Sequence, residues 1–130
     1  MQILVAYRGT NVGKDLLNLA TQHAKAFGGK IQLVTSLPGG EKTTKEIIIE
    51  AEENLAEAGT FFDEQGIQYV SHLLIRNRTA GEDIVSFAAE NDCDEIIIGV
   101  KSRSKVGKIL FGSTAQHIIL KASCPVVSVK

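Results

Sequence analysis

The chain has 130 residues, of which 44% are hydrophobic and 22% charged, and its formal net charge is −1. This length and composition fit one globular domain with a proper core, so we expect a single domain over residues 1–130. A nearly neutral chain lacks the general electrostatic attraction that nucleic-acid binding needs. No apolar run approaches the length of a membrane-spanning helix, and the N-terminal MQILVAYRG lacks the layout of a signal peptide. The expectation is therefore a cytoplasmic protein that binds neither nucleic acid nor membrane.

Short apolar runs alternate with amphipathic segments along the whole chain. Glycines or turn residues separate most of them, as expected at the ends of strands and helices. In chain order, the pattern predicts a strand over 2–6, a helix over 11–27, a strand over 30–37, a helix over 41–65 whose first turns are open, a strand over 67–75, a helix after the capping residue Thr79, a strand over 95–99, a helix from Ser113 and a strand over 126–129.

Strands that alternate with helices indicate an α/β fold in which helices cover both faces of a parallel sheet. Right-handed crossovers restrict five strands to a doubly wound sheet, for which we expect the order 3-2-1-4-5. In that order the chain reverses direction between the first and fourth strands. Ligands bind at the carboxyl ends of those two strands, which places residues 7–10 and 99–112 at the predicted crevice.

The segment from Gly99 to Ser113 carries the features of a phosphate site. Four cations follow the fourth strand without an intervening acid, namely Lys101, Arg103, Lys105 and Lys108. Gly112 then precedes a helix for which Ser113 stands at the expected N-cap and Gln116 at the capping-box spacing. A helix start offers backbone N–H groups and the positive end of the helix dipole, which favour an anion. The alternative is an ordinary strand–helix connection with a solvated basic loop.

Two other phosphate-handling arrangements are excluded by particular residues. A P-loop needs glycine where Arg8 stands and a hydroxyl residue where Asp15 stands. A response-regulator receiver needs acids after the first and third strands, where the chain has Tyr7, Arg8 and Arg76. No general base is placed near the proposed phosphate site and no residue is assigned a catalytic role, so at most slow hydrolysis of a bound phosphate compound is expected. The histidines and cysteines lack metal-ligand spacing.

The chain resembles the universal stress protein family from residue 1 to residue 130. Its nucleotide-binding members carry a glycine, two residues, a second glycine, nine residues, and then glycine with serine or threonine. Here Gly99, Ser102 and the pair Gly112-Ser113 occupy this frame, and residues 124–127 resemble the family's last strand. The resemblance implies a stress-response sensor or regulatory module that binds an adenine nucleotide such as ATP, with Mg²⁺ on the phosphates. The nucleotide-binding residues it implies are Ala6, Tyr7, Arg8, Ser36, Gly99, Lys101, Ser102, Gly112, Ser113 and Thr114.

Two positions depart from the family pattern. Ser102 replaces the second glycine, and Arg8 replaces an acid that can accept hydrogen bonds from ribose hydroxyls, which arginine cannot do. Arg8 can instead pair with a phosphate, or it can pair with an acid and fill the pocket. Two functions therefore stay open: nucleotide binding, and a dimeric stress-response interaction module of the same fold that binds no nucleotide.

The predicted sheet has the last strand at one edge. Val126, Val127 and Val129 make this strand apolar, and an uncovered apolar edge is a template for pairing with another chain. We expect a two-fold homodimer through this strand, as the family resemblance also implies. The alternative is that Pro125 and Lys130 protect a short edge.

Cys93 and Cys124 precede the fourth and fifth strands, so both are expected at the end of the sheet away from the crevice. A reversible disulfide and two small buried thiols are both compatible with this placement, and the cytosolic setting favours the thiols.

Overall fold

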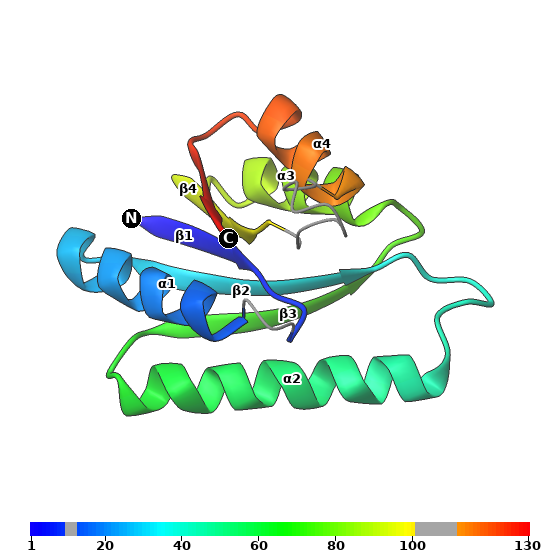
Figure 1. Cartoon of the computed structure of the whole chain (residues 1–130), viewed down its shortest axis with the longest axis horizontal. Helices are drawn as coiled ribbons and strands as arrows, with labels where there is room; N and C mark the ends of the chain where they lie inside the picture. The colour runs from blue at the N-terminus through cyan, green and yellow to red at the C-terminus, as the bar shows by residue number, and fades with distance from the viewer. Residues whose placement is uncertain (10–12, 101–111) are drawn as a thin grey trace, which may run out of the picture.

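The computed structural model describes residues 1–9, 13–100 and 112–130. Five strands and four helices alternate in this part of the chain, as the hydrophobic pattern predicts (Figure 1). They are β1 (Gln2–Ala6), α1 (Gly13–Phe27), β2 (Lys30–Leu37), α2 (Lys45–Glu64), β3 (Tyr69–Ile75), α3 (Ala80–Glu90), β4 (Glu95–Gly99), α4 (Ser113–Lys121) and β5 (Val126–Val129).

All neighbouring strands pair in parallel, and their order is β3-β2-β1-β4-β5. The predicted doubly wound order 3-2-1-4-5 is therefore confirmed. β1 is central because it pairs with β2 on one side, where Val5 lies opposite Leu33, and with β4 on the other, where Val5 lies opposite Ile97. β3 and β5 form the two edges of the sheet.

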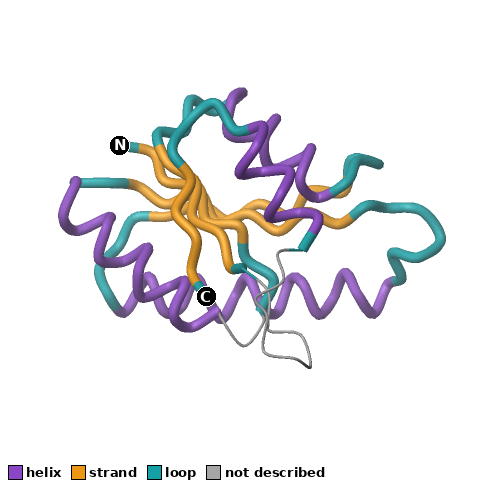
Figure 2. Tube along the Cα trace, turned by 45° about the horizontal axis from the view of Figure 1, so that its top comes forward, coloured by secondary structure: helices purple, strands orange, loops and turns teal. Residues whose placement is uncertain are grey.

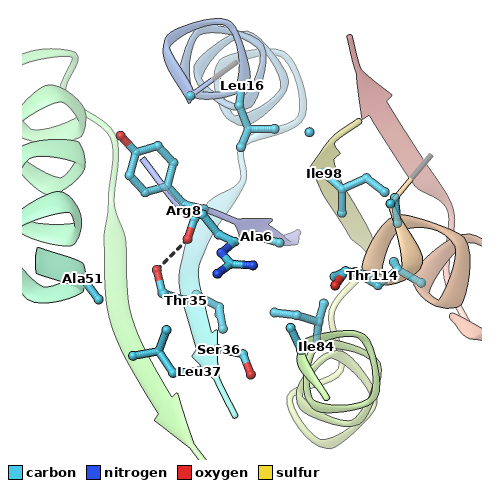
Figure 3. Close-up of a pocket in the computed structure, with 18 of the residues that line it drawn as sticks. Ala6, Arg8, Leu16, Thr35, Ser36, Leu37, Ala51, Ile84, Ile98 and Thr114 are labelled. Carbon is cyan, nitrogen blue, oxygen red and sulfur yellow. Dashed lines mark hydrogen bonds between the residues drawn. The ribbon is translucent and has the colours of Figure 1, made fainter. Parts of the chain in front are cut away.

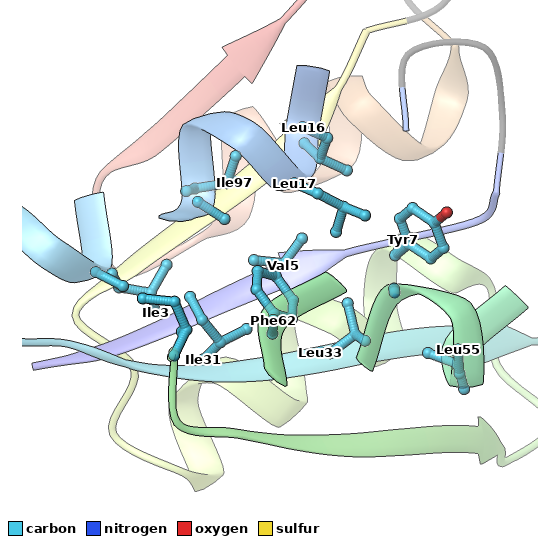
Figure 4. Close-up of a cluster of buried hydrophobic side chains, with 14 residues drawn as sticks. Ile3, Val5, Tyr7, Leu16, Leu17, Ile31, Leu33, Leu55, Phe62 and Ile97 are labelled. Carbon is cyan, nitrogen blue, oxygen red and sulfur yellow. The ribbon is translucent and has the colours of Figure 1, made fainter. Parts of the chain in front are cut away.

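Helices cover both faces of the sheet, and each face has its own core (Figure 2). On one face, Leu17 of α1 and Phe62 of α2 pack against Ile3 and Val5 of β1 (Figure 4). On the other face, α3 and α4 pack against Leu4 and the alternate residues of β2 and β4. Successive side chains of a strand point to opposite faces, so a continuous apolar strand supplies both cores.

Two helix starts are capped by threonine side chains. Thr44 accepts a hydrogen bond from the N–H of Ile47 at 3.3 Å, so α2 begins at Lys45, within the range that the sequence left open. Thr79 accepts from the N–H of Glu82 at 3.3 Å and donates its hydroxyl to the Glu82 carboxylate at 2.8 Å. The cap predicted at Thr79 is therefore present.

Both cysteine thiols are free, with Cys93 buried and Cys124 half-buried. Burial, followed by the nearby Cys124, raises the pKa of the Cys93 thiol to about 11. Burial also raises the pKa of Cys124. Because the thiolate is the reactive form, both thiols are poor nucleophiles at neutral pH.

No helix in the described ranges combines the length and the apolar character that crossing a membrane requires.

Candidate functional site

A pocket of about 630 Å³ opens where β1, β2 and β4 end at their carboxyl ends (Figure 3). Its walls include the first turn of α4, the N-terminal half of α2 and the start of α3. Doubly wound sheets bind ligands at this place because neighbouring crossovers leave the sheet in opposite directions there. The volume lies within the range of small-molecule sites.

Eight residues that the sequence assigned to a nucleotide site line this one pocket. They are Ala6, Tyr7, Arg8, Ser36, Gly99, Gly112, Ser113 and Thr114. Lys101 and Ser102 lie outside the described residues. The structure thus brings together residues from four segments, and their contact with a nucleotide stays a prediction.

The first turn of α4 differs from the prediction in its cap. Gly112, not Ser113, is the N-cap residue, with φ −66° and ψ 160°, and Ser113 is the first residue of the helix. The predicted N-cap at Ser113 is therefore wrong, because the backbone becomes helical one residue earlier. Gly112 has no side chain, so the N-cap residue itself forms no side-chain hydrogen bond with this turn. A glycine cap contributes no side-chain acceptor of its own that competes with a ligand for the backbone N–H groups at the helix start.

The guanidinium group of Arg8 lies within the pocket (Figure 3). Arg8 is exposed, and it forms no ion pair with a carboxylate among the described residues. Its position follows from β1, because Ala6 and Arg8 point to the same face of the sheet. The pocket therefore contains a cation that a ligand anion can neutralise.

The ring of Tyr7 points to the opposite face. It packs in the core beneath α1 and α2 and is 8% exposed (Figure 4). Burial first, and Glu57 second, raise the pKa of its hydroxyl. The main chain of Tyr7 is fixed at the pocket by two hydrogen bonds: its N–H donates to Val34 O at 2.9 Å, and its carbonyl accepts from the Thr35 hydroxyl at 2.6 Å.

Sequence reasoning missed the contribution of α2. Ile47, Glu50, Ala51 and Asn54 line the pocket from this helix. Glu50 is the one carboxylate among the described lining residues. Asn54 also packs on Gly9, since a Cβ built on Gly9 lies 2.6 Å from the Asn54 side-chain nitrogen. The spacing of 47, 51 and 54 on one helix face was a usable signal, but it also fits a helix that covers only the core.

A buried carboxylate lies directly behind the pocket wall. Asp83 of α3 is fully buried, and both of its oxygens are hydrogen-bonded. Oδ2 accepts from the Ser36 hydroxyl at 2.9 Å, and Oδ1 accepts from Arg76 Nε at 2.6 Å. The hydrogen bond to Asp83 is also the largest of the effects that raise the pKa of the Arg76 guanidinium. No pattern in the sequence distinguishes this acid, which lies within an otherwise apolar helix face.

Comparison with known proteins gives a consistent result over the whole chain. The family model described as "Universal stress protein family" matches residues 1–130. A universal stress protein from Archaeoglobus fulgidus has 38% sequence identity and a TM-score of 0.91, with 99% of this chain and 97% of that chain covered. A second structure, of the universal stress protein from Archaeoglobus fulgidus in complex with dAMP, has 35% identity, a TM-score of 0.84 and coverage of 99% and 96%.

A curated relative from Thermus aquaticus extends the agreement at the sequence level. It is described as a universal stress protein in the QAH/OAS sulfhydrylase 3′ region, and it is 29% identical over 137 residues, which cover 98% of this chain and 97% of the relative. The family model matches this chain from residue 1 to residue 130. This match agrees with the observed sheet order and with the pocket at the carboxyl ends of β1 and β4. The chain therefore belongs to the universal stress protein family.

Proposed function

We propose that this chain binds an adenine nucleotide in the pocket at the carboxyl ends of β1 and β4. The observation that carries the proposal is the pairing of two anion-favouring features in one pocket: the α4 N-terminus, whose N-cap residue is a glycine, and the Arg8 guanidinium. The related protein from Archaeoglobus fulgidus that is 35% identical binds dAMP, which supports the choice of ligand class.

In this arrangement the phosphates lie at Gly112, Ser113 and Thr114, where backbone N–H groups and hydroxyls meet them. Apolar side chains such as Ile84 and Ile98 provide surfaces for the base. We propose ATP, with Mg²⁺ on its phosphates, as the ligand of a sensor or regulatory module in the stress response. Lys101 and Ser102, outside the described residues, are expected at the same phosphates.

The second candidate is an interaction module of the same fold that binds no nucleotide. The observation that favours it is the position of Arg8, whose guanidinium lies inside the pocket (Figure 3). The two candidates make opposite predictions for Arg8. It is a ligand contact in the first and an obstruction in the second.

Calorimetric titration with AMP and with ATP–Mg²⁺ distinguishes them. Arg8→Ala is compared with Arg78→Ala, because Arg78 is an exposed arginine that donates to Ser86 and does not line the pocket. Removing a charge-assisted hydrogen bond weakens binding by roughly ten- to a hundredfold, and the Arg78 variant is expected to match the wild type. Tighter binding by Arg8→Ala supports the obstructed pocket. Absence of binding by all three folded proteins rejects the nucleotide function.

We also propose that the chain forms a homodimer through β5. β5 is an edge strand, and Val126, Val127 and Val129 are only half-buried in the single chain. Leu120, near the end of the preceding helix, is 76% exposed. Pairing with a second copy covers this apolar edge.

The backbone of β5 suggests how to test the dimer. The carbonyl of Pro125 accepts a hydrogen bond from Ile96 of β4, and that of Val129 accepts from Val100, just after β4. The alternate residue Ser128 therefore directs its N–H to the free edge. Ser128→Pro removes that donor without removing a bond to β4. Sedimentation velocity is expected to show a wild-type dimer, a dimer for Ser128→Ala and a monomer for Ser128→Pro. A wild-type monomer at micromolar concentration contradicts the proposal.

A further inference from the structure

Arg8 and the start of α4 lie on different walls of the pocket. Arg8 follows β1, and the alternation of side chains along a strand directs it to the same face of the sheet as Ala6. Figure 3 shows its guanidinium group on the side of β1 and β2, whereas Thr114 projects from α4 on the opposite side. The pocket therefore has two places that favour an anion, and they belong to different elements.

Two carboxylates near the pocket are candidate partners of Arg8, and neither pairs with it. Asp83, behind the wall, is fully buried, and its two oxygens accept hydrogen bonds from Ser36 and Arg76. Glu50 lines the pocket from α2, and no ion pair joins it to Arg8 in the described part of the chain. The charge of Arg8 is therefore not neutralised by a carboxylate of the described residues.

The two walls offer the same kind of hydrogen-bonding group. A guanidinium has five N–H donors and no acceptor, and its planar fork binds two oxygens of one phosphate at once. The backbone N–H groups at the α4 start are also donors. A ligand that matches both walls therefore carries an anionic group toward each of them. In a nucleoside bisphosphate, the ribose separates the 5′-phosphate from a second phosphate on its 2′- or 3′-oxygen.

We infer that Arg8 forms a second phosphate subsite, so that the pocket favours a nucleoside 2′,5′- or 3′,5′-bisphosphate over a nucleotide with phosphates at the 5′ position alone. The inference rests on the proposed nucleotide site, with one phosphate at the start of α4. In doubly wound dinucleotide-binding folds, an arginine near the ribose accommodates a phosphate on a ribose oxygen. Arg8 provides the same chemistry just after the central strand β1.

Calorimetric titration compares four ligands with the same base: AMP, ADP, adenosine 2′,5′-bisphosphate and adenosine 3′,5′-bisphosphate. ADP is the matched ligand, because it has as many phosphates as either bisphosphate but carries both at the 5′ position. Wild type is expected to bind one of the two bisphosphates about tenfold or more tightly than ADP, the value of a charge-assisted hydrogen bond.

Three variants test whether Arg8 causes this preference. Arg8→Gln removes the charge and breaks no ion pair of the described residues, and it is expected to lower the preference for the bisphosphate over ADP by about tenfold or more. Arg8→Lys keeps the charge without the planar fork, so it is expected to keep part of the preference. Arg78→Gln is the matched control, because Arg78 donates to Ser86 and does not line the pocket. It is expected to keep the wild-type preference.

Four other results have distinct meanings. Wild-type binding of ADP as tight as that of both bisphosphates overturns the inference and leaves the nucleotide function standing. A loss by one common factor for all four ligands in Arg8→Gln also overturns it, because Arg8 then contacts a group that all four share. Tighter binding of the bisphosphates by Arg8→Gln overturns it as well, since the arginine then obstructs the pocket. Absence of binding of all four ligands to folded wild type rejects the proposed function itself.

Discussion

Replacing Gly112 by aspartate is expected to change the stability of α4 and its affinity for an anion in opposite directions. The N-cap backbone has φ −66° and ψ 160°, which any residue adopts, and a Cβ built there has no neighbour within 4 Å among the described residues. Asp at the N-cap is better than Gly by a few tenths of a kcal/mol, and its charge at the helix start adds about 0.3–1 kcal/mol. Gly112→Asp is therefore expected to raise the free energy of unfolding by about 0.5–1.5 kcal/mol, which corresponds to a melting temperature higher by roughly 2–6 °C.

The same substitution is expected to impair nucleotide binding. The new carboxylate accepts the N–H groups that the phosphate needs, and it also repels the phosphate charge. Loss of one charge-assisted hydrogen bond is about 1.5–3 kcal/mol, so affinity for AMP is expected to fall by roughly ten- to a hundredfold. Thermal unfolding followed by circular dichroism and calorimetric titration measure the two effects on one sample. Gly112→Asn is the matched control, because asparagine caps the helix without the negative charge and is expected to lose less affinity.

Stabilisation with unchanged AMP affinity in Gly112→Asp refutes the assignment of the α4 N-terminus as the phosphate site. Destabilisation by the aspartate refutes the N-cap assignment itself.

The remaining predictions concern the core and two titrating groups. Phe62 is fully buried, so Phe62→Ala is expected to lower the free energy of unfolding by about 3–5 kcal/mol in urea titrations, and a loss below about 1 kcal/mol contradicts its place in the core. The Cys93 thiol has a pKa of about 11, so we expect iodoacetamide to alkylate it slowly at neutral pH, with a rate that rises about tenfold per pH unit. Mass spectrometry of the folded protein measures this rate. A rate that does not depend on pH contradicts the prediction. Burial, and then Lys30, lower the pKa of His72, so the unfolded chain takes up this proton first, at a pH of about 6.5. The free energy of unfolding is therefore expected to fall as the pH drops through that value and to level off below the pKa of His72 in the folded protein. Urea titrations at a series of pH values measure this dependence in the wild type and in His72→Gln. An equally steep change of the urea midpoint with pH in both proteins contradicts the prediction.

The sequence was sufficient for the sheet because each strand is buried on both faces or bounded by turn residues. The continuous apolar run Ile96-Ile97-Ile98 is typical of a central parallel strand. The right-handedness of the crossover connections then restricts the strand order. The crevice followed from that order alone. Its position at the ends of β1 and β4 did not depend on identifying any ligand-binding motif.

Other features depend on side-chain direction and on packing between distant segments. Ser113 and Gly112 are both acceptable N-caps by composition, and only the backbone angles decide between them. Asn54 reaches the pocket because a 20-residue α2 extends along the sheet and packs on Gly9, a contact between positions 45 residues apart. The burial of Asp83 depends on its partners Ser36 and Arg76, which come from other elements. Local periodicity contains no information about such contacts.

The central claim is that a nucleotide phosphate binds at the start of α4, and backbone amide resonances test it most directly. Isotope-labelled wild-type protein is titrated with AMP and with ATP–Mg²⁺ while two-dimensional amide spectra are recorded. We predict saturable shifts at Ser113, Thr114 and Ala115, with a dissociation constant in the micromolar range. Unchanged resonances at these three residues in millimolar nucleotide, with the spectrum of a folded protein, contradict the claim.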